Sequence, residues 1–495
     1  MKAIMVVGTA SHAGKSLITT ALCRILNRRG WRVAPFKGQN MALNAYVTNT
    51  GAEIGYAQAV QAWAAGVAPQ VEMNPILLKP QGDMTSQVIL QGRAVGRTNA
   101  KDYYEKFFDT GWKAIKESLT RLGQDFDLVV CEGAGSPAEV NLKHRDLTNM
   151  RVAKHLNATT VLVADIDRGG VFAHIIGTLE LLEPEERALI KGIVINKFRG
   201  QRELLQSGIE WLEARTGIPV IGVVPWLAQS FPAEDSLSLM EPSSQKKSAE
   251  LNIAVIRLPH ISNFTDFDPL EAEASVNVSY ISPKDSLGYP DAVILPGTKT
   301  TISDLMVLKR TGMAEEIQSY ASAGGTVLGI CGGYQMMGEY MADPEGIEGQ
   351  DGRYPGLGLL PVRTIISSKK VARQRLVTSE YPYMGLPVSG YELHQGRTQM
   401  VASNQADETT YENLFDDKGL GLVDSSQSVW GVYLHGLFDN GPWRRSWLNR
   451  LRQQRGLGSL PTGINNYREQ REMMLDLLAD SVDAYLDLNP LLAEQ

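Results

Sequence analysis

A glycine-rich stretch near the start of the chain has the residue types of a phosphate-binding loop. The segment GTASHAGKS (8–16) directly follows the apolar run AIMVV (3–7) and precedes a helical pattern. Backbone N–H groups of such a loop and of the following helix form a cradle for anions. Lys15 would reach the β- and γ-phosphates of ATP, and the Ser16 hydroxyl would bind Mg²⁺. Gly14 lies six residues after Gly8, and Thr9 takes the place of the usual first glycine of this motif.

Carboxylate and amide side chains follow three other predicted strands. Glu132 lies in CEGAG (131–135), where the glycines would let a ligand approach the backbone, so we expect it to bind Mg²⁺ with Ser16. Asp165 and Asp167 are second candidates for Mg²⁺ or substrate, with helix capping as the alternative. Asn196 would contact the nucleotide base, with a simple turn as the alternative.

Three polar segments between these strands, 37–45, 79–87 and 139–149, indicate a large ligand that carries carboxylates. We expect them to be loops in which cations and amides bind a polyanionic substrate near ATP. Asp146, in the third segment, would help to position a carboxylate or a metal ion. The side chains concerned are Lys37, Gln39, Asn40, Asn44, Lys79, Gln81, Lys143 and Arg145.

A cysteine between a predicted strand and a helix has the setting of a catalytic nucleophile. Cys331 follows TVLGI (326–330) and precedes two glycines, which permit the sharp turn that such a residue needs. The start of the helix favours the thiolate form. The N–H of Gly332 would stabilise the oxyanion of a tetrahedral intermediate, and Gly297, in LPG (295–297), would supply the second donor.

A thiolate nucleophile needs a base, and His435, just after the run VWGVYL (429–434), is our candidate. His394 is the second candidate and His260 the third. The position two residues after His435 is Leu437, so the acidic third member that often follows such a histidine is missing there. The pattern therefore predicts a Cys–His pair that is oriented by a group from elsewhere in the chain.

The elements that must position these residues alternate between strands and helices. In the first half, continuously apolar runs at 3–7, 32–36, 127–131, 160–165, 192–196 and 219–224 indicate strands buried on both faces of a parallel sheet. Segments 15–29 and 52–65 between them have helical patterns. This alternation predicts a doubly wound α/β domain over 1–232.

A polar segment, 233–250, has no apolar periodicity and is predicted to be a linker. A second series of strands follows at 252–258, 291–297, 326–333, 389–393 and 429–436, which predicts a second doubly wound domain over 251–495. The last residues have a helical pattern, and the apolar positions expected on its one face are Met474, Leu475, Leu477, Leu478, Val482 and Leu486.

Composition excludes several classes of protein. The 495 residues carry a net charge of −7, which disfavours a protein that grips nucleic acid through phosphate contacts. Three cysteines exclude a disulfide scaffold and fit a reducing compartment. No apolar run approaches the roughly 18 residues of a membrane span. We therefore expect a cytoplasmic protein without membrane or nucleic-acid partners, and leave its oligomeric state open.

The two sets of motifs resemble known enzyme families. The segment GICGGYQ with the later YLHG resembles a class I-like glutamine amidotransferase domain of the Cys–His type, and GTASHAGKS with EGAGS resembles the ATPase domain of dethiobiotin synthetase-like enzymes. Together, in this order, they resemble the cobyrinic acid amidating enzymes. The segments that match one branch of that family are KGQNMALNA, EGAGSPAEVNL, DIDRGGVFA, INKFRG and RLPHISNFTDFDPL.

The resemblance implies an ATP- and glutamine-dependent amidoligase of cobalamin biosynthesis. In the matching branch, four peripheral carboxylates (b, d, e and g) of adenosylcobyrinic acid a,c-diamide become amides and adenosylcobyric acid results. Cys331 and His435 would hydrolyse glutamine, Gln335 would contact bound glutamine, and Asp146 would act at the amidation site. An ammonia route between the domains is a further hypothesis. The alternatives are another glutamine-dependent ligase, such as cobyrinic acid a,c-diamide synthase, and a P-loop regulatory ATPase with a degenerate second domain.

Overall fold

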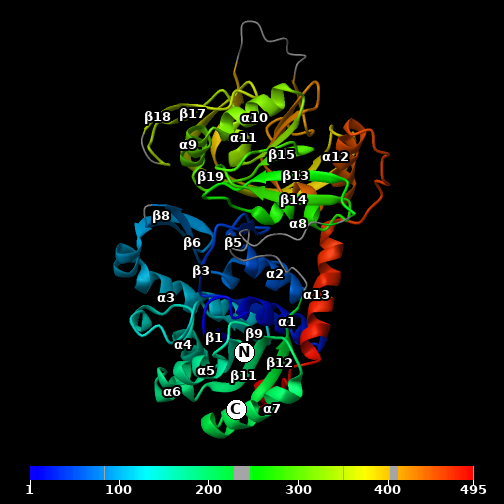
Figure 1. The fold of residues 1–495 in the computed structure, drawn as a ribbon. Coiled ribbons are helices and arrows are strands. Elements are labelled where there is room, and N and C mark those ends of the chain that lie inside the picture. The colour runs from blue at the N-terminus through cyan, green and yellow to red at the C-terminus, as the bar shows by residue number, and fades with distance from the viewer. Residues whose placement is uncertain (83, 228–245, 247, 349–350, 402–410, 494–495) are drawn as a thin grey trace.

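The computed structural model describes residues 1–82, 84–227, 246, 248–348, 351–401 and 411–493. It is an α/β structure with two doubly wound units, one above the other in Figure 1, as predicted. Most of the predicted linker lies outside the described residues. In the part of the chain that is described, no helix is long and apolar enough to span a membrane.

The first unit is built on a parallel sheet of six strands in the order β12-β11-β10-β1-β9-β2. Apolar side chains on both faces of these strands are buried, as the continuous apolar runs predicted. The strands are β1 (Lys2–Gly8), β2 (Val33–Phe36), β9 (Leu128–Glu132), β10 (Thr159–Asp165), β11 (Ile190–Phe198) and β12 (Val220–Pro225). The helices are α1 (Lys15–Arg28), α2 (Tyr56–Ala64), α3 (Ala100–Asp125), α4 (Met150–Leu156), α5 (Val171–Glu180), α6 (Pro184–Arg187) and α7 (Arg202–Thr216).

A second, smaller sheet in this unit corrects the prediction of polar loops at 37–45 and 79–87. These segments contain all of β3 (Gln39–Met41), the start of β4 (Ala45–Val47), the end of β6 (Ile76–Gly82) and part of β7 (Thr85–Leu90). With β8 (Arg93–Asn99) they form a sheet in the order β3-β6-β7-β8, and β4 pairs with β5 (Glu53–Gly55). The helix predicted from residue 52 therefore begins only at Tyr56. A short 3-10 helix, η1 (Val71–Met73), precedes β6, and another, η2 (Lys143–Arg145), lies in the segment 139–149.

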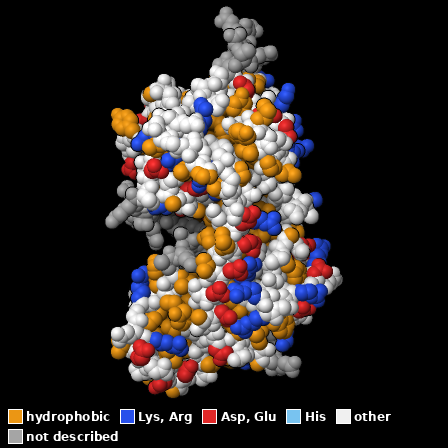
Figure 2. All heavy atoms as spheres, turned by 90° about the vertical axis from the view of Figure 1, so that its right-hand side faces the viewer, with side chains coloured by type: hydrophobic (Ala, Val, Ile, Leu, Met, Phe, Trp, Pro, Cys, Tyr) orange, Lys and Arg blue, Asp and Glu red, His pale blue; other side chains and the backbone are white. Residues whose placement is uncertain are grey.

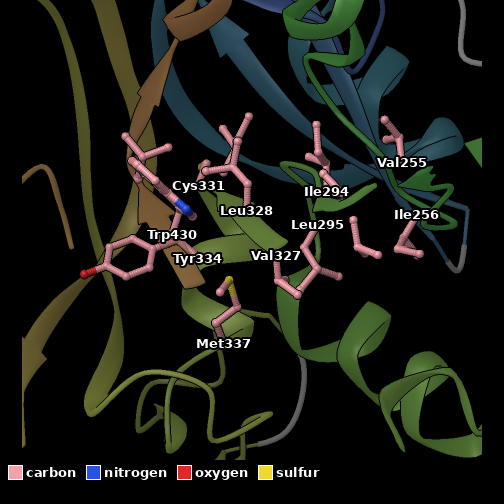
Figure 3. Packing of buried hydrophobic residues seen from close by; sticks show 14 of the residues in the cluster. Val255, Ile256, Ile294, Leu295, Val327, Leu328, Cys331, Tyr334, Met337 and Trp430 are labelled. Carbon is pink, nitrogen blue, oxygen red and sulfur yellow. The ribbon is translucent and has the colours of Figure 1, made fainter. Parts of the chain in front are cut away.

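The second unit contains a seven-stranded sheet in the order β14-β13-β15-β16-β23-β22-β21, in which the first five strands are parallel. Its strands are β13 (Leu251–Ile256), β14 (Val276–Ile281), β15 (Ala292–Leu295), β16 (Thr326–Ile330), β21 (Tyr411–Asn413), β22 (Gly421–Asp424) and β23 (Val429–Val432). Figure 3 shows side chains of β13, β15 and β16 packing in one core with Trp430 and with Tyr334 and Met337, which follow Cys331.

A five-stranded sheet, β18-β17-β19-β20-β24, lies beside it. Its strands are β17 (Tyr340–Asp343), β18 (Gly352–Pro355), β19 (Val362–Thr378), β20 (Pro387–Met400) and β24 (Leu434–His435). The sequence pattern had indicated only 389–393 of the long β19–β20 pair. The helical elements of this unit are η4 (Phe264–Phe267), α8 (Asp268–Glu271), α9 (Thr301–Thr311), α10 (Met313–Ser322), α11 (Gly332–Met336), η6 (Leu437–Asp439) and α12 (Gly441–Gln454).

The C-terminal helices return to the first unit. In α13 (Tyr467–Asp483), Leu475, Leu478 and Val482 are buried in the core that also contains α1, and α14 (Asn489–Leu492) packs there too. Leu477, expected on the same face, is exposed. Figure 2 shows acidic and basic side chains alternating down this face of the molecule. The ion pairs between α1 and α13 join Arg24 to Glu472 and Asp476, Arg28 to Asp480, and Arg29 to Asp483.

The two units also share a small apolar core. Tyr391 and Leu393, on β20 of the second unit, pack with Ala45, Val47 and other residues of the small sheets of the first unit. The hydroxyl of Tyr391 donates a hydrogen bond to the carbonyl of Ala45 (3.0 Å), and Asn263 Oδ1 accepts one from the N–H of Ala45 (3.0 Å). The small sheets therefore connect the large sheet of the first unit to β20 of the second.

Candidate active sites

The glycine-rich loop lies between β1 and α1, where the sequence predicted it. The Lys15 ammonium donates hydrogen bonds to the carbonyls of Ala10 and Gly135, both at 2.9 Å. Gly14 has φ 102°, and a Cβ atom there would lie 2.0 Å from Asn196 Nδ2, so only glycine fits. Asn196 Nδ2 also donates to the carbonyl of Ala13 (2.9 Å). Asn196 thus braces the loop, and its role toward a base stays a prediction.

Glu132 is buried at the end of β9 and directly contacts Ser16. Ser16 Oγ donates to Glu132 Oε1 (2.9 Å), the Lys37 ammonium contacts the same oxygen (2.9 Å), and Gln61 Nε2 donates to Oε2 (2.5 Å). A hydroxyl and a carboxylate side by side fit Mg²⁺, which commonly takes one or two protein oxygens together with phosphate oxygens and water. Within the described ranges, no group of three or more His, Cys, Asp or Glu side chains could hold a metal ion.

Asp165 caps a turn rather than a helix, since α5 begins only at Val171, and its role as a ligand stays a prediction. Its Oδ1 accepts a hydrogen bond from the N–H of Asp167 (2.8 Å), and its Oδ2 pairs with the Lys197 ammonium (2.8 Å). Lys197 also donates to the carbonyl of His12 in the phosphate-binding loop (2.8 Å). Asp167 pairs with Arg199 (3.0 Å). These contacts hold the loop against the ends of β10 and β11.

Asp146 caps the start of α4. Its Oδ1 accepts hydrogen bonds from the N–H groups of Thr148 (2.9 Å) and Asn149 (2.7 Å), and its Oδ2 accepts one from Arg151 (3.0 Å). The side chain of Asn149 in turn donates to the carbonyl of Ala134, in the loop after β9 (2.8 Å). Asp146 therefore positions the segment that contacts the loop after Glu132, and its direct role in amidation stays a prediction.

Cys331 lies at the turn between β16 and α11. Its φ of 52° is in the left-handed region, which a cysteine adopts only where the surrounding structure enforces it. Gly333 permits this turn, because a Cβ atom there would lie 2.0 Å from the carbonyl of Leu295. The thiol is buried, with Sγ 3.5 Å from the carbonyl oxygen of Leu393 on β20.

His435 lies near Cys331, and Asp266 holds its imidazole. His435 Nδ1 lies 2.7 Å from Asp266 Oδ2, and Asp266 Oδ1 accepts the N–H of Gly436 (2.9 Å). Burial alone would lower the pKa of His435, but Asp266 and Cys331 together raise it to about 10. This electrostatic setting favours an imidazolium beside the sulfur, which is the form that supports a thiolate nucleophile.

Asp266 is the residue that sequence reasoning missed. It lies in η4, 169 residues before His435 in the sequence, so no spacing close to the histidine points to it. The sequence signal was present in NFTDFDPL (263–270), a motif noted for its family resemblance. The other two histidine candidates pair with their own carboxylates: His394 with Glu392 (3.3 Å) and His260 with Asp304 (2.8 Å).

The residues predicted to bind glutamine and its oxyanion lie around Cys331. Gln335 is buried, and its Nε2 donates to the carbonyl of Gln395 (2.9 Å) and to the Tyr433 hydroxyl (3.0 Å). A Cβ atom at Gly332 would lie 3.1 Å from the backbone nitrogen of Thr298, and one at Gly297 would lie 3.1 Å from Cε1 of His435. The backbone at 297–298 therefore lies close to both Gly332, the residue after Cys331, and His435.

A buried cluster of charges joins the two units close to Cys331. Glu53 of the first unit pairs with Lys79 (2.7 Å) and with Lys370 of β19. Burial would raise the pKa of Glu53, but the two lysines lower it to about 2. Lys299 lies near the same charges, and its removal from water lowers its pKa to about 7. Two of the cations predicted to bind substrate are thus paired with carboxylates of the protein. Lys79 pairs with Glu53, and Lys143 pairs with Glu186 (2.8 Å).

Comparisons with known families agree with both centres. Residues 4–237 match the CobQ/CobB/MinD/ParA nucleotide binding domain, and residues 252–443 match the CobB/CobQ-like glutamine amidotransferase domain. A solved structure of PurLQS from Thermotoga maritima is 19% identical, with a TM-score of 0.30, and the match covers 46% of this chain and 97% of that one.

Full-length relatives are much more similar. The chain is 73% identical to the cobyric acid synthase of Trichormus variabilis, over 99% of each chain. It is 72% identical to the cobyric acid synthase of Nostoc punctiforme, over the whole of both chains. At this level of identity over the full length, and with both domains matched in the same order, the chain belongs to the cobyric acid synthase family.

Proposed function

We propose that this protein amidates the b, d, e and g carboxylates of adenosylcobyrinic acid a,c-diamide, with ATP and glutamine as cosubstrates, to give adenosylcobyric acid. The observation that carries the proposal is the pairing of two centres in one chain, Cys331–His435–Asp266 and Lys15–Ser16–Glu132. Three free, buried cysteines support a reducing compartment, and we propose the cytoplasm as its location.

In the second unit, the Cys331 thiolate would attack the side-chain amide carbon of glutamine. The tetrahedral oxyanion would be stabilised by the N–H groups of Gly332 and Gly297, and the His435 imidazolium would protonate the leaving nitrogen. Ammonia would leave, and a thioester would remain on Cys331. Water, deprotonated by His435, would then release glutamate and restore the thiol. Asp266 keeps the imidazole in the orientation that both proton transfers need.

In the first unit, a substrate carboxylate would attack the γ-phosphorus of ATP, giving an acyl phosphate and ADP. Lys15 would offset the charge on the phosphates, and Ser16 with Glu132 would hold Mg²⁺, which screens the same charge when bound. Ammonia would then attack the acyl carbon, and phosphate would leave. The activation matters because a free carboxylate is a poor electrophile.

Ammonia has to travel from Cys331 to the first unit as the neutral molecule, and we propose that it follows a line of buried polar residues. Glu53 lies at the junction of the units, where it pairs with Lys370 of β19. From β5 the line continues through Asn74, which accepts from the N–H of Gly55 and donates to the carbonyl of Lys37. Lys37 contacts Glu132.

Unpartnered amide atoms support this route. Nε2 of Gln58 and Oε1 of Gln61 are buried without a hydrogen-bond partner within the described structure. Buried polar atoms without partners are costly, so they mark places where a small polar molecule can bind. Both residues lie on α2. Gln61 contacts Glu132, at the end of the line where ammonia would be consumed, and Gln58 accepts a hydrogen bond from Asn40.

The experiment is mass spectrometry of a reaction with the a,c-diamide corrinoid, MgATP and glutamine. Each conversion replaces a hydroxyl by an amino group, so successive mass losses count the amidations. We expect four losses with the unmodified protein and glutamine. Cys331→Ala should give no loss with glutamine and all four losses with added ammonium. ATP hydrolysis without any change in corrinoid mass would contradict this substrate. Losses with cobyrinic acid but none with its a,c-diamide would favour the a,c-diamide synthase reaction instead.

A further inference from the structure

A cavity of about 700 Å³ lies where α2, α13 and the segment after β24 meet. Of the described residues, neither Cys331 nor Lys15 nor Glu132 lines it, so neither the thiol nor the phosphate-binding residues face it. Asp266 and Tyr391 nevertheless form part of its wall. The cavity is within the size range of small-molecule sites, which is roughly 300–1,000 Å³.

Arg471, on α13, is a buried cation that lines this cavity and lacks hydrogen-bond acceptors. Its side chain is 8% exposed, and both Nε and Nη1 are buried without a hydrogen-bond partner within the described structure. The closest carboxylate oxygen recorded is Oδ2 of Asp439, 3.7 Å from Nη1, which is too long for a hydrogen bond. A guanidinium in this state lacks the acceptors that usually compensate its burial.

Three carboxylates, Asp266, Asp439 and Glu472, and two arginines, Arg468 and Arg471, line the cavity. Asp266 pairs with His435, and Glu472 shares Arg24 with Asp476. Asp439 is the carboxylate that faces Arg471, and burial raises its pKa to about 6, which weakens its charge in mild acid.

Aromatic rings form the rest of the wall. The Arg471 guanidinium lies over the ring of Trp63, 3.7 Å from its centroid. Tyr46 packs edge-on against Trp63 (5.2 Å between centroids) and against Tyr391 (5.3 Å). This wall offers apolar surface for the body of a ligand beside a cationic group that fits an oxyanion.

We propose that this cavity is a binding site for a small carboxylate-bearing molecule, with the carboxylate on Arg471 and the apolar part of the molecule against Trp63 and the tyrosines. A guanidinium fork matches the geometry of a carboxylate, and a hydrogen bond between charged groups is worth more than a neutral one. The site adjoins the Asp266 side of the Cys331 centre but does not include the thiol. Its test measures binding alone, so its outcome is independent of the proposed reaction.

The test uses 8-anilinonaphthalene-1-sulfonate, a fluorescent oxyanion with aromatic rings, and the full-length protein with saturating MgATP to fill the nucleotide site. We expect one probe to bind per chain, and Arg471→Met to weaken binding about tenfold or more. Arg471→Lys keeps the positive charge but lacks the forked guanidinium, so it should weaken probe binding less than Arg471→Met. The matched control is Arg215→Met. Arg215 is an exposed residue of α7, so this variant should bind the probe like the unmodified protein.

A second variant keeps the test valid if Arg471→Met does not fold. Ala68 is exposed and lines the cavity, so Ala68→Trp fills the space without removing a charge. Thermal unfolding shows whether each variant is folded. Loss of probe binding in Ala68→Trp supports the site. Unchanged binding in either folded cavity variant, or no binding to the unmodified protein, overturns it.

Competition identifies the source of the carboxylate. Displacement of the probe by a corrinoid polycarboxylate, but not by L-glutamate, would make the cavity a second contact for the substrate. Displacement by L-glutamate would make it an amino-acid site. Displacement by neither would overturn the assignment to a carboxylate.

Discussion

His435 and Asp266 are 169 residues apart in the sequence, yet His435 Nδ1 lies 2.7 Å from Asp266 Oδ2. Asp266 comes from η4, which is followed directly by α8 at the edge of the second unit, and His435 comes from β24. The second carboxylate oxygen holds the N–H of Gly436, so the carboxylate fixes both the ring and the backbone beside it. The histidine that contacts Cys331 is thus oriented by an aspartate that precedes it in the chain.

Asp266→Asn should lower glutamine hydrolysis roughly 10²- to 10⁴-fold, because the amide can hold His435 in the wrong tautomer and gives no charge to stabilise the imidazolium. Amidation driven by added ammonium should be unaffected, because it does not use the glutamine site. Glutamate release and corrinoid mass, measured on the same preparation, check both expectations.

Asp285→Asn is the control for this change, since Asp285 is an exposed aspartate of the second unit. It should retain glutaminase activity. Full glutaminase activity in Asp266→Asn would show that His435 works without this carboxylate.

Lys15→Met should abolish amidation with either nitrogen source, with a loss of at least about 10²-fold. The phosphates of ATP would lose their cation, whereas Cys331 and His435 would be untouched, so glutamine hydrolysis should persist. Lys191→Met, an exposed lysine on β11, serves as the control. If ammonium-driven amidation survived in Lys15→Met, the phosphate-binding loop would not be the activation site.

Glu53→Gln should destabilise the protein by about 3–5 kcal/mol, because Lys79 and Lys370 would lose their shared carboxylate inside the structure. Urea unfolding of Glu53→Gln, Lys370→Met and the double variant measures the coupling between the two residues. A loss in the double variant equal to the sum of the single losses would contradict a direct interaction.

The same ion pairs predict an acid dependence. Because the two lysines hold the folded-state pKa of Glu53 down to about 2, its stabilising contribution is complete above the usual glutamate pKa. The contribution disappears as the pH falls from that value toward 2. The difference in stability between the unmodified protein and Glu53→Gln should therefore shrink in acid. If this difference in stability stayed constant as the pH fell, the ion pairs of Glu53 would not be its cause.

The pH dependence of glutamine hydrolysis should reflect His435. The pKa of His435 in the folded protein is raised to about 10. The stability that its imidazolium contributes is complete below the ordinary histidine pKa, and it is lost as the pH rises through about 10. The rate of ammonia release should fall over that alkaline range. In Asp266→Asn the fall should move to lower pH, since Asp266 is a main cause of the raised pKa. If the rate fell at the same alkaline pH in both proteins, deprotonation of His435 would not be the cause of the fall.

Local sequence patterns predicted the parts of the fold in which burial is uniform along an element. The central strands of both large sheets are buried on both faces, so their apolar runs were visible without any partner. The small sheets were not visible, because their strands mix buried charged groups with apolar ones. Lys79 and Glu53 have the residue types of surface loops, and only their mutual contact allows both to be buried.

The same limit applies to the candidate sites. Lys15, Ser16 and Cys331 each lie next to a strand–helix junction, so local spacing predicts their positions. Asp266 acts through a contact made by folding, and no spacing within one segment reveals it. The C-terminal helix is a similar case. The pattern predicted a helix, but its ion pairs with α1 involve arginines far away in the sequence: Arg24 and Asp476, for example, are 452 residues apart.

The most direct test of two centres acting in series is isotope tracing. The protein is supplied with corrinoid a,c-diamide, MgATP and glutamine labelled with ¹⁵N in its side-chain amide, together with excess unlabelled ammonium at neutral pH. If ammonia passes inside the protein from Cys331 to the acyl phosphate, the new amides carry ¹⁵N in far greater proportion than the ammonium in solution. Amides whose ¹⁵N content matches that of the solution would show that the two centres work independently.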